Sequence, residues 1–130
     1  AAVCADPYGA AMWSWFTHGN TDTDDGDSFA EGIGQMRVTK NIEGLSVDKA
    51  YRIDDQTALS IVYQLLHEEG LFLGLSSGIN IGGAVRFAQE HGPGATIVTI
   101  LCDYGTRYAS KLFNPVFLRE KNLPLPRWMK

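Results

Sequence analysis

The stretch EEGLFLGLSSGINIGGAV, residues 68–85, contains the turn that decides the fold. Its first part ends a helix at a glycine, and the apolar run LFLGL (71–75) that follows is typical of a short buried strand. Two serines and a glycine (76–78) then lead into a second helix. Hydroxyls at a strand-to-helix turn either cap the helix or contact a ligand, and capping is the more common role.

Strands and helices are predicted to alternate on both sides of this turn. The predicted strands are DKAYRID (48–54), LFLGL (71–75) and ATIVTILC (95–102), and the predicted helices are QTALSIVYQLLHEEG (56–70) and INIGGAVRFAQEHG (79–92). The last strand is β-branched and unbroken, as expected of a strand that is covered on both faces. This order indicates an α/β fold with a mostly parallel sheet flanked by helices.

The helix of residues 56–70 is expected to pack through a broad apolar face. Asp54 or Asp55 would cap its first turn, and Gly70 would end it. In the next helix, Gly82 and Gly83 predict close packing against the sheet, because glycine in a helix interior costs about 1 kcal/mol. The apolar face of the first helix consists of Ala58, Ile61, Val62, Leu65 and Leu66.

The chain opens with AAVCADPYGAA (1–11), which is typical of a short buried strand that runs into a turn. A short helix is predicted to follow and to end at Gly19. Because a strand needs a neighbour, this start indicates a piece of a larger sheet. At the other end, residues 114–130 are predicted to form a short helix and an extended tail that Trp128 could anchor.

Two loops follow the first helix. NTDTDDGDS (20–28) carries four aspartates. A calcium loop would need the D-x-[DN]-x-[DN]-G pattern with a glutamate further on. The run does not complete that pattern, so a solvated surface loop is the preferred interpretation. EGIGQMRVTKNIEG (31–44) is rich in glycine, and Gly32 and Gly34 predict a sharp turn or a close approach of the backbone.

The whole chain of 130 residues suits one domain. Hydrophobic residues make up 45% and charged residues 20%, and the net charge of −4 with scattered lysines and arginines argues against a nucleic-acid surface. No apolar run approaches the roughly 20 residues needed to cross a bilayer. Cys4 and Cys102 are too few for a disulfide scaffold, and no Cys or His spacing resembles a zinc site. A cytoplasmic protein without a metal site is therefore expected.

Ligands of open α/β sheets bind beyond the carboxyl ends of the strands. If strands 71–75 and 95–102 are neighbours joined by a right-handed crossover, the turns after them open on the same edge. That places Ser76 beside Cys102 and Asp103. Each also has a structural explanation, Ser76 and Asp103 as helix caps and Cys102 as a small buried hydrophobe. A hydrolase is poorly supported, because no histidine lies near the cysteine in sequence and no G-x-S-x-G motif surrounds the serine.

Three segments, in order, resemble the cysteine synthase (O-acetylserine sulfhydrylase) family. They are CADPYGAAM (4–12), EGIGQMRVTKNIEG (31–44) and EGLFLGLSSGINIGGAVRFAQEHGPGATIVTILCDYGTRYASKLFN (69–114), and they span nearly all of the chain. The resemblance implies a fold-type II enzyme that uses pyridoxal 5′-phosphate (PLP) to make L-cysteine from O-acetylserine and sulfide by β-replacement.

The same resemblance implies roles for individual residues. Ser76 matches the first serine of the family's S-[SA]-G turn, which hydrogen-bonds the pyridine nitrogen, so Ser76 would both cap the helix and meet the cofactor. Gly32 matches the loop that faces the cofactor and the substrate, and Cys102 matches a position near the pyridine nitrogen. A neutral hydroxyl leaves that nitrogen largely unprotonated, which suits β-elimination and replacement rather than transamination.

Other parts of the family pattern are missing from this chain. It has no Ser-x-Lys-Asp-Arg motif around a Schiff-base lysine, no T-S-G-N-T-G substrate loop and no G-T-G-G-T phosphate loop. Residues 1–130 therefore resemble the C-terminal part of the large, cofactor-binding domain, with the N-terminal half of the fold absent. The resemblance implies no catalytic residue within this chain and no synthase activity for the chain alone.

Partners and alternatives also follow from the resemblance. The expected partners are the missing N-terminal half, a second copy in a homodimer and the C-terminal tail of serine acetyltransferase. Two alternatives stay open: a cysteine desulfhydrase or cystathionine β-synthase-like enzyme, and a non-catalytic binding fragment. A sheet edge left unpaired would also invite association with another polypeptide.

Overall fold

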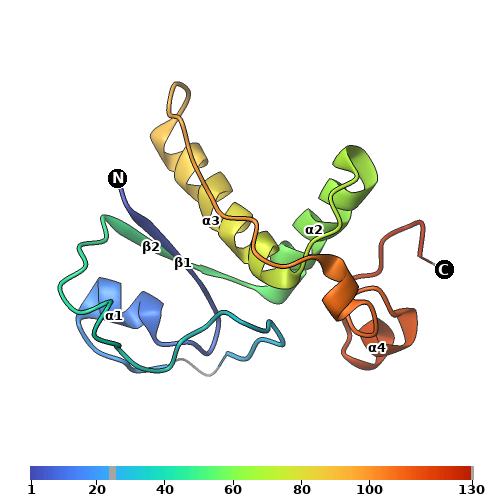
Figure 1. Ribbon diagram of the computed structural model, residues 1–130, viewed down its shortest axis with the longest axis horizontal. Coiled ribbons are helices and arrows are strands. Elements are labelled where there is room, and N and C mark those ends of the chain that lie inside the picture. The colour runs from blue at the N-terminus through green and yellow to red at the C-terminus, as the bar shows by residue number, and fades with distance from the viewer. Residues whose placement is uncertain (24–25, 130) are drawn as a thin grey trace.

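Helices lie on both sides of a short parallel sheet in the computed structural model, which describes residues 1–23 and 26–129 (Figure 1). The elements are β1 (Val3–Pro7), α1 (Met12–His18), β2 (Lys49–Ile53), α2 (Asp55–Glu69), α3 (Leu75–His91), the 3-10 helix η1 (Gly105–Tyr108) and α4 (Pro115–Glu120). β1 and β2 pair in parallel, with Val3 opposite Lys49. α3 packs against both strands on one side, α1 contacts them on the other, and α2 packs against α3. The predicted α/β class is confirmed, as is the end of α1 at Gly19.

α2 begins and ends where the sequence predicts. The Thr57 N–H donates to Asp54 Oδ1 at 2.8 Å, which makes Asp54 the cap. Gly70 ends the helix with a φ of 69°, a left-handed conformation that glycine adopts without strain.

The buried face of α2 is rotated from the predicted one. Ile61, Leu65 and Leu66 are only half-buried. The difference arises because the C-terminal segment covers part of the helix, where Tyr63 Oη donates to the Leu112 carbonyl at 2.6 Å. The fully buried side chains of α2 are Ala58, Leu59, Val62 and Tyr63.

α3 starts four residues earlier than predicted, at Leu75, and the predicted strand 71–75 is wrong. That segment forms only an isolated antiparallel bridge between Leu73 and Tyr104. The N-cap is Gly74, and no side chain makes a capping hydrogen bond. The expectation that Ser76 caps the helix is therefore also wrong. The early start follows from packing, since a Cβ at Gly78 would lie 2.3 Å from the Ala58 carbonyl oxygen of α2. Only a glycine permits this contact between the two helices.

The predicted strand 95–102 is likewise wrong for the chain described here. These residues run as an irregular segment along α3 (Figure 1). Val98 is 86% exposed and Ile100 is 68% exposed. A strand forms only beside another strand, and no described residue pairs with this segment. The composition of this segment is suited to burial in a sheet, but no described strand lies beside it to form hydrogen bonds with it.

Close packing of α3 on the sheet is confirmed at both predicted glycines. A Cβ at Gly82 would lie 2.9 Å from Ile53 Cγ2, and a Cβ at Gly83 would lie 2.6 Å from the Ala5 side chain. Real Cβ atoms rarely approach so closely, so these glycines let the helix backbone approach β1 and β2.

The C-terminal tail folds back on α2. α4 confirms the predicted short helix, and the Trp128 ring meets Tyr63 edge to face at 5.9 Å. None of the described helices has the length and hydropathy needed to cross a bilayer. The acidic run at 20–28, weighed above as a calcium or surface loop, includes residues 24 and 25, which lie outside the described residues.

Candidate functional site: the carboxyl edge of the sheet

The N-terminus of α3 points to the carboxyl edge of the sheet. Gly82, in the middle of the helix, packs on Ile53 at the carboxyl end of β2. At the C-terminal end of the helix, Glu90 accepts a hydrogen bond from Tyr51 Oη at 2.8 Å and pairs with Lys49. α3 thus runs antiparallel to the strands, which places its first turn where α/β proteins bind ligands.

Two loops meet at this edge. The Gly74 N–H donates to the Asp103 carbonyl at 2.8 Å, and the Gly105 N–H donates to the Phe72 carbonyl at 2.8 Å. The Cys102 N–H donates to Ser77 Oγ at 3.0 Å. The two turns therefore lie side by side, although neither preceding segment is one of the neighbouring strands on which that prediction depended.

Ser76 and Ser77 differ in how their hydroxyls are used. Ser77 is fully buried, and its Oγ accepts from Cys102. Ser76 is 3% exposed, yet its hydroxyl makes no hydrogen bond to any described residue. A buried polar group without a partner costs about 1–3 kcal/mol. A polar ligand atom that formed a hydrogen bond with the Ser76 hydroxyl would remove this cost.

Cys102 and Asp103 lie beside this turn but not in the roles predicted from the sequence. Cys102 is exposed rather than a buried hydrophobe, and Asn80 Nδ2 donates to its Sγ at 3.6 Å. Asp103 makes no helix cap, because Tyr108 Oη donates to its Oδ2 at 2.5 Å. That hydrogen bond, together with burial, raises the pKa of Tyr108. Cys102 is exposed because the 95–102 segment lies on the surface.

The glycine-rich loop is turned as predicted. Gly32 is exposed with φ of 76°, and Gly34 has φ of 86°. A Cβ at Gly34 would lie 2.9 Å from Pro7 Cγ, which confirms a close backbone approach at the end of β1. Cys102 lies beside the turn of Ser76 and Ser77, whereas no hydrogen bond among the described residues joins Gly32 to them.

Asp55 is a positioning residue that the sequence reasoning considered only as a helix cap. Its carboxylate accepts from Ser28 Oγ at 2.5 Å and from the Phe29 N–H at 3.0 Å, which ties the segment just before the glycine-rich loop to α2. Burial raises the pKa of Asp55, although these two hydrogen bonds act in the opposite direction. The Asp54-Asp55 pair in the sequence could have indicated this role. Only one of two adjacent aspartates caps a given helix, so the other has a different function.

The residues of this edge fit one part of a PLP site. A buried hydroxyl that lacks a partner can donate to a pyridine nitrogen, and the positive end of the α3 dipole disfavours a proton on that nitrogen. Two of the lysines, Lys49 and Lys111, form surface ion pairs with Glu90 and Glu31. Within the described residues, no three His, Cys, Asp or Glu side chains gather as metal ligands would.

An α/β fold with a helix N-terminus at its carboxyl edge provides a place for a ligand. Residues 1–103 match the family "Pyridoxal-phosphate dependent enzyme". The chain therefore belongs to this family of PLP-dependent enzymes.

Relatives and a solved structure agree with that assignment. The chain is 42% identical to "Cysteine synthase 1" of Neurospora crassa over 94% of its own length and 33% of that protein. It is 41% identical to "Cysteine synthase 2" of Schizosaccharomyces pombe, over 93% and 34% respectively. It superimposes with a TM-score of 0.70 and 29% identity on an O-acetylserine dependent cystathionine β-synthase from Helicobacter pylori, covering 84% of this chain and 33% of that one. The chain thus spans about a third of the length of these relatives.

Proposed function

We propose that residues 1–130 are the C-terminal part of the large domain of a cysteine synthase, which makes L-cysteine from O-acetylserine and sulfide. The observation that carries this proposal is 42% identity to a cysteine synthase across 94% of the chain. The buried, unpartnered hydroxyl of Ser76 supports it independently, because it provides a polar contact where the cofactor ring would lie.

In the proposed enzyme, the Ser76 hydroxyl would donate a hydrogen bond to the pyridine nitrogen of PLP. The bound cofactor supplies the electron sink for β-replacement. The α3 N-terminus keeps the ring nitrogen neutral, since a positive charge there would face the positive end of the helix dipole. Gly32 lets the loop backbone face cofactor and substrate, and Cys102 lies near the ring nitrogen without a chemical role of its own.

The remaining machinery belongs to the part of the enzyme outside these residues. The Schiff-base lysine, the phosphate loop and most of the substrate site are assigned there, so the chain alone is expected to be inactive. The active form is proposed to be a cytoplasmic homodimer of the complete polypeptide, with the C-terminal tail of serine acetyltransferase as a further partner.

The test is a chimera in which residues 1–130 replace the matched third of Neurospora crassa cysteine synthase 1. We expect it to show the visible absorption of bound PLP and to produce cysteine from O-acetylserine and sulfide, while residues 1–130 alone do neither. Cysteine production by residues 1–130 alone at enzyme-like rates would refute the proposal that the catalytic residues lie outside this segment.

Ser76→Ala in the chimera tests the residue assignment. Loss of a hydrogen bond worth about 1.4–2.8 kcal/mol predicts an activity lower by about tenfold to a hundredfold, together with a shifted cofactor absorption band. The matched control is Ser60→Ala, since the exposed Ser60 hydroxyl bonds only to the Gln56 carbonyl of its own helix. If the two variants have equal activity and equal spectra, Ser76 does not contact the ring.

A cystathionine β-synthase is the second candidate, and two similar proteins support it. One is the Helicobacter pylori structure, and the other is a Bacillus subtilis O-acetylserine dependent cystathionine β-synthase that is 33% identical over 62% of the chain. Both identities are lower than those to the two cysteine synthases named above. Because residues 1–130 carry only part of the substrate site, product analysis of the natural full-length enzyme with sulfide and with homocysteine decides between them.

A further inference from the structure

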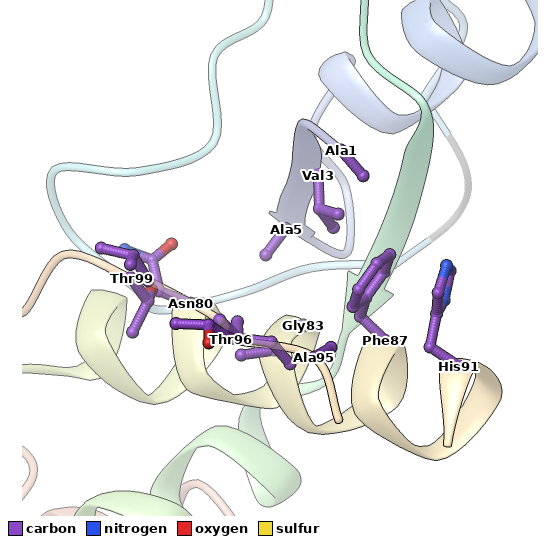
Figure 2. A pocket seen from close by; sticks show the side chains of 13 residues that line it. Ala1, Val3, Ala5, Asn80, Gly83, Phe87, His91, Ala95, Thr96 and Thr99 are labelled. Atoms are coloured by element: carbon purple, nitrogen blue, oxygen red, sulfur yellow. The ribbon is translucent and has the colours of Figure 1, made fainter. Parts of the chain in front are cut away.

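Two hollows lie beside the sheet, and the smaller of them adjoins the glycine-rich loop. The larger, of about 430 Å³, is lined by β1, α3 and residues 95–99, and none of its described lining residues comes from the loop (Figure 2). The smaller, of about 200 Å³, is lined by residues 7–10 at the end of β1 and by residues of the segment 26–36. Because open space beside a loop leaves it room to move, the position of this loop depends on the contacts that hold it.

Asp55 holds the three residues that precede the loop. Ser28 Oγ donates to Asp55 Oδ1 at 2.5 Å, and the Phe29 N–H donates to Asp55 Oδ2 at 3.0 Å. The Ala30 N–H donates to the same Ser28 Oγ at 3.1 Å, so Ser28 connects Asp55 to the backbone at Ala30. Hydrogen bonds to an ionised carboxylate are about twice as strong as those between neutral groups. We call these three hydrogen bonds the Asp55 anchor.

The C-terminal segment supports the same stretch of chain. The Phe29 ring meets Phe117 of α4 edge to face, with ring centroids 6.0 Å apart, and Glu31 forms a surface ion pair with Lys111. An exposed ion pair contributes little to stability, whereas the hydrogen bonds of Asp55 are half-buried. Asp55 is therefore the main polar contact of this stretch.

A second contact holds the loop on the far side of Gly32. The Ala11 N–H donates to the Gln35 carbonyl at 3.0 Å. Residues 31–34 separate this contact from the Asp55 anchor, and Gly32 among them is exposed with φ of 76°. The position of the Gly32 backbone therefore follows from two contacts that lie only a few residues away.

We propose that Asp55 is a positioning residue for the substrate, because through Ser28 it holds the backbone at Gly32 where the substrate binds. The inference rests on the proposed function, in which this loop backbone faces cofactor and substrate. Asp55 acts through the loop and not by contact with the substrate. Since the anchor holds the loop equally before and during the reaction, its loss raises KM and leaves kcat nearly unchanged.

A matched pair of substitutions in the chimera described above, Ser28→Ala and Thr57→Val, tests this role. Each removes a hydroxyl that donates to an aspartate at the start of α2, Ser28 to Asp55 at 2.5 Å and Thr57 to Asp54 at 2.8 Å. Ser28→Ala should raise the KM for O-acetylserine about tenfold, keep kcat within about twofold and leave the absorption of bound PLP unchanged. Thr57→Val should change none of the three, because its hydroxyl bonds to the helix cap and not to the loop.

Asp55→Asn tests the other end of the same contact. An amide keeps one acceptor oxygen and replaces the other by a donor, so one of the two hydrogen bonds to Asp55 is lost and KM should rise by a similar factor. The double substitution with Ser28→Ala should raise KM little further, because both changes remove the same contact. A rise in KM equal to the product of the two single effects would overturn the assignment of both residues to one anchor.

Hydrogen exchange measures whether the loop is loosened, without any need for activity. The Ala11 amide is suited to this because Ala11 is buried and donates to Gln35, beyond the loop from Ser28. It should exchange at least about fivefold faster in the Ser28→Ala chimera than in the parent chimera, and at the parent rate in the Thr57→Val chimera. Equal KM and equal exchange in the two variants would overturn the proposal, as would a fall in kcat with KM unchanged.

These results are separable from the test of the proposed function. A parent chimera that makes no cysteine rejects the proposed function, and exchange at Ala11 then decides whether Asp55 anchors the loop: faster exchange in Ser28→Ala supports the anchor, and an unchanged rate rejects it. Cysteine production with the same KM in Ser28→Ala and Thr57→Val rejects the role of Asp55 alone.

Discussion

Ser77 shows how one hydroxyl can connect two loops that are 25 residues apart in sequence. Its Oγ accepts the Cys102 N–H, and with the Gly74 and Asp103 backbone contact it holds the end of segment 95–102 against the first turn of α3. The Ser76 hydroxyl makes no hydrogen bond to a described residue and stays available to a ligand. The two adjacent serines therefore have separate tasks, one structural and one proposed for the cofactor.

Ser77→Ala should lower the free energy of unfolding by about 1 kcal/mol, because the Cys102 amide loses its partner. Urea denaturation measures the change, and Ser60→Ala, at an exposed helix position, should stay within about 0.5 kcal/mol of the parent chain. Equal stability of the two variants would show that the loops are held without the Ser77 hydroxyl.

Asp6 gives the chain a predictable dependence on pH. The carboxyl is 2% exposed and accepts the Trp13 N–H at 2.9 Å, and burial raises its pKa above the ordinary value of 3.8. Between those two pKa values the folded state binds more protons than the unfolded state, so stability falls as the pH rises through this range. Asp6→Asn keeps an acceptor for Trp13 and should reduce this slope.

The measurement is the free energy of unfolding at several pH values from about 4 upward, the region above the ordinary pKa of an aspartate. The exposed Asp22→Asn is the control and should keep the slope of the parent chain. Part of the slope should persist in the Asp6→Asn variant, because burial also raises the pKa of Asp55. A slope unchanged by Asp6→Asn would mean that this carboxyl titrates alike in both states.

At the scale of elements, the contact between α2 and α3 fixes the candidate site. Gly78 lets the first turn of α3 approach the first turn of α2, and Asp54 caps α2 directly after β2. Asp55 then ties residues 28 and 29, which precede the glycine-rich loop, to the same end of α2. Two helix starts and one loop are thus brought to the carboxyl edge by residues next to the end of β2.

Gly78→Ala should lower the free energy of unfolding by about 2–3 kcal/mol, because the new methyl group would overlap a backbone carbonyl that cannot move away by itself. The exposed Gln89→Ala in the same helix is the control and should be nearly neutral. Thermal unfolding followed by circular dichroism compares the two. A stable Gly78→Ala variant would show that α2 and α3 can separate without cost.

At the scale of the whole molecule, the chain exposes apolar surface that a sheet would cover. Val98 and Ile100 are the clearest cases, and both lie in the irregular segment of residues 95–102. The two-stranded sheet leaves one edge of β1 open beside them. Such an edge and such a surface favour association with another polypeptide.

The chain alone should therefore enhance the fluorescence of the dye ANS, which binds exposed apolar surface, and the chimera should do so much less. Val98→Asp should weaken the enhancement in the chain alone, whereas Val116→Asp should weaken it less. No enhancement by the chain alone would mean that segment 95–101 is already covered in solution.

The sequence predicted those elements whose signals are local. Asp54 before an apolar helix, glycines after α1 and α2, and a glycine pair within α3 each specify a cap, an end or a close contact through their own chemistry. The family likewise followed from three short segments in order. The predictions that failed were the strands 71–75 and 95–102. Their apolar composition indicates that the residues are suited to burial, but it does not specify a strand conformation.

The sequence by itself determined where α1 and α2 end, that Asp54 or Asp55 caps α2, and which residue is proposed to meet the cofactor. Only the tertiary structure decided that Ser76 is buried without a partner, that Ser77 rather than Ser76 links the two loops, and that residues 95–102 lie unpaired on the surface. The physical reason is that caps and glycine turns are satisfied by neighbours in sequence. Strand pairing and burial depend instead on what lies alongside in space.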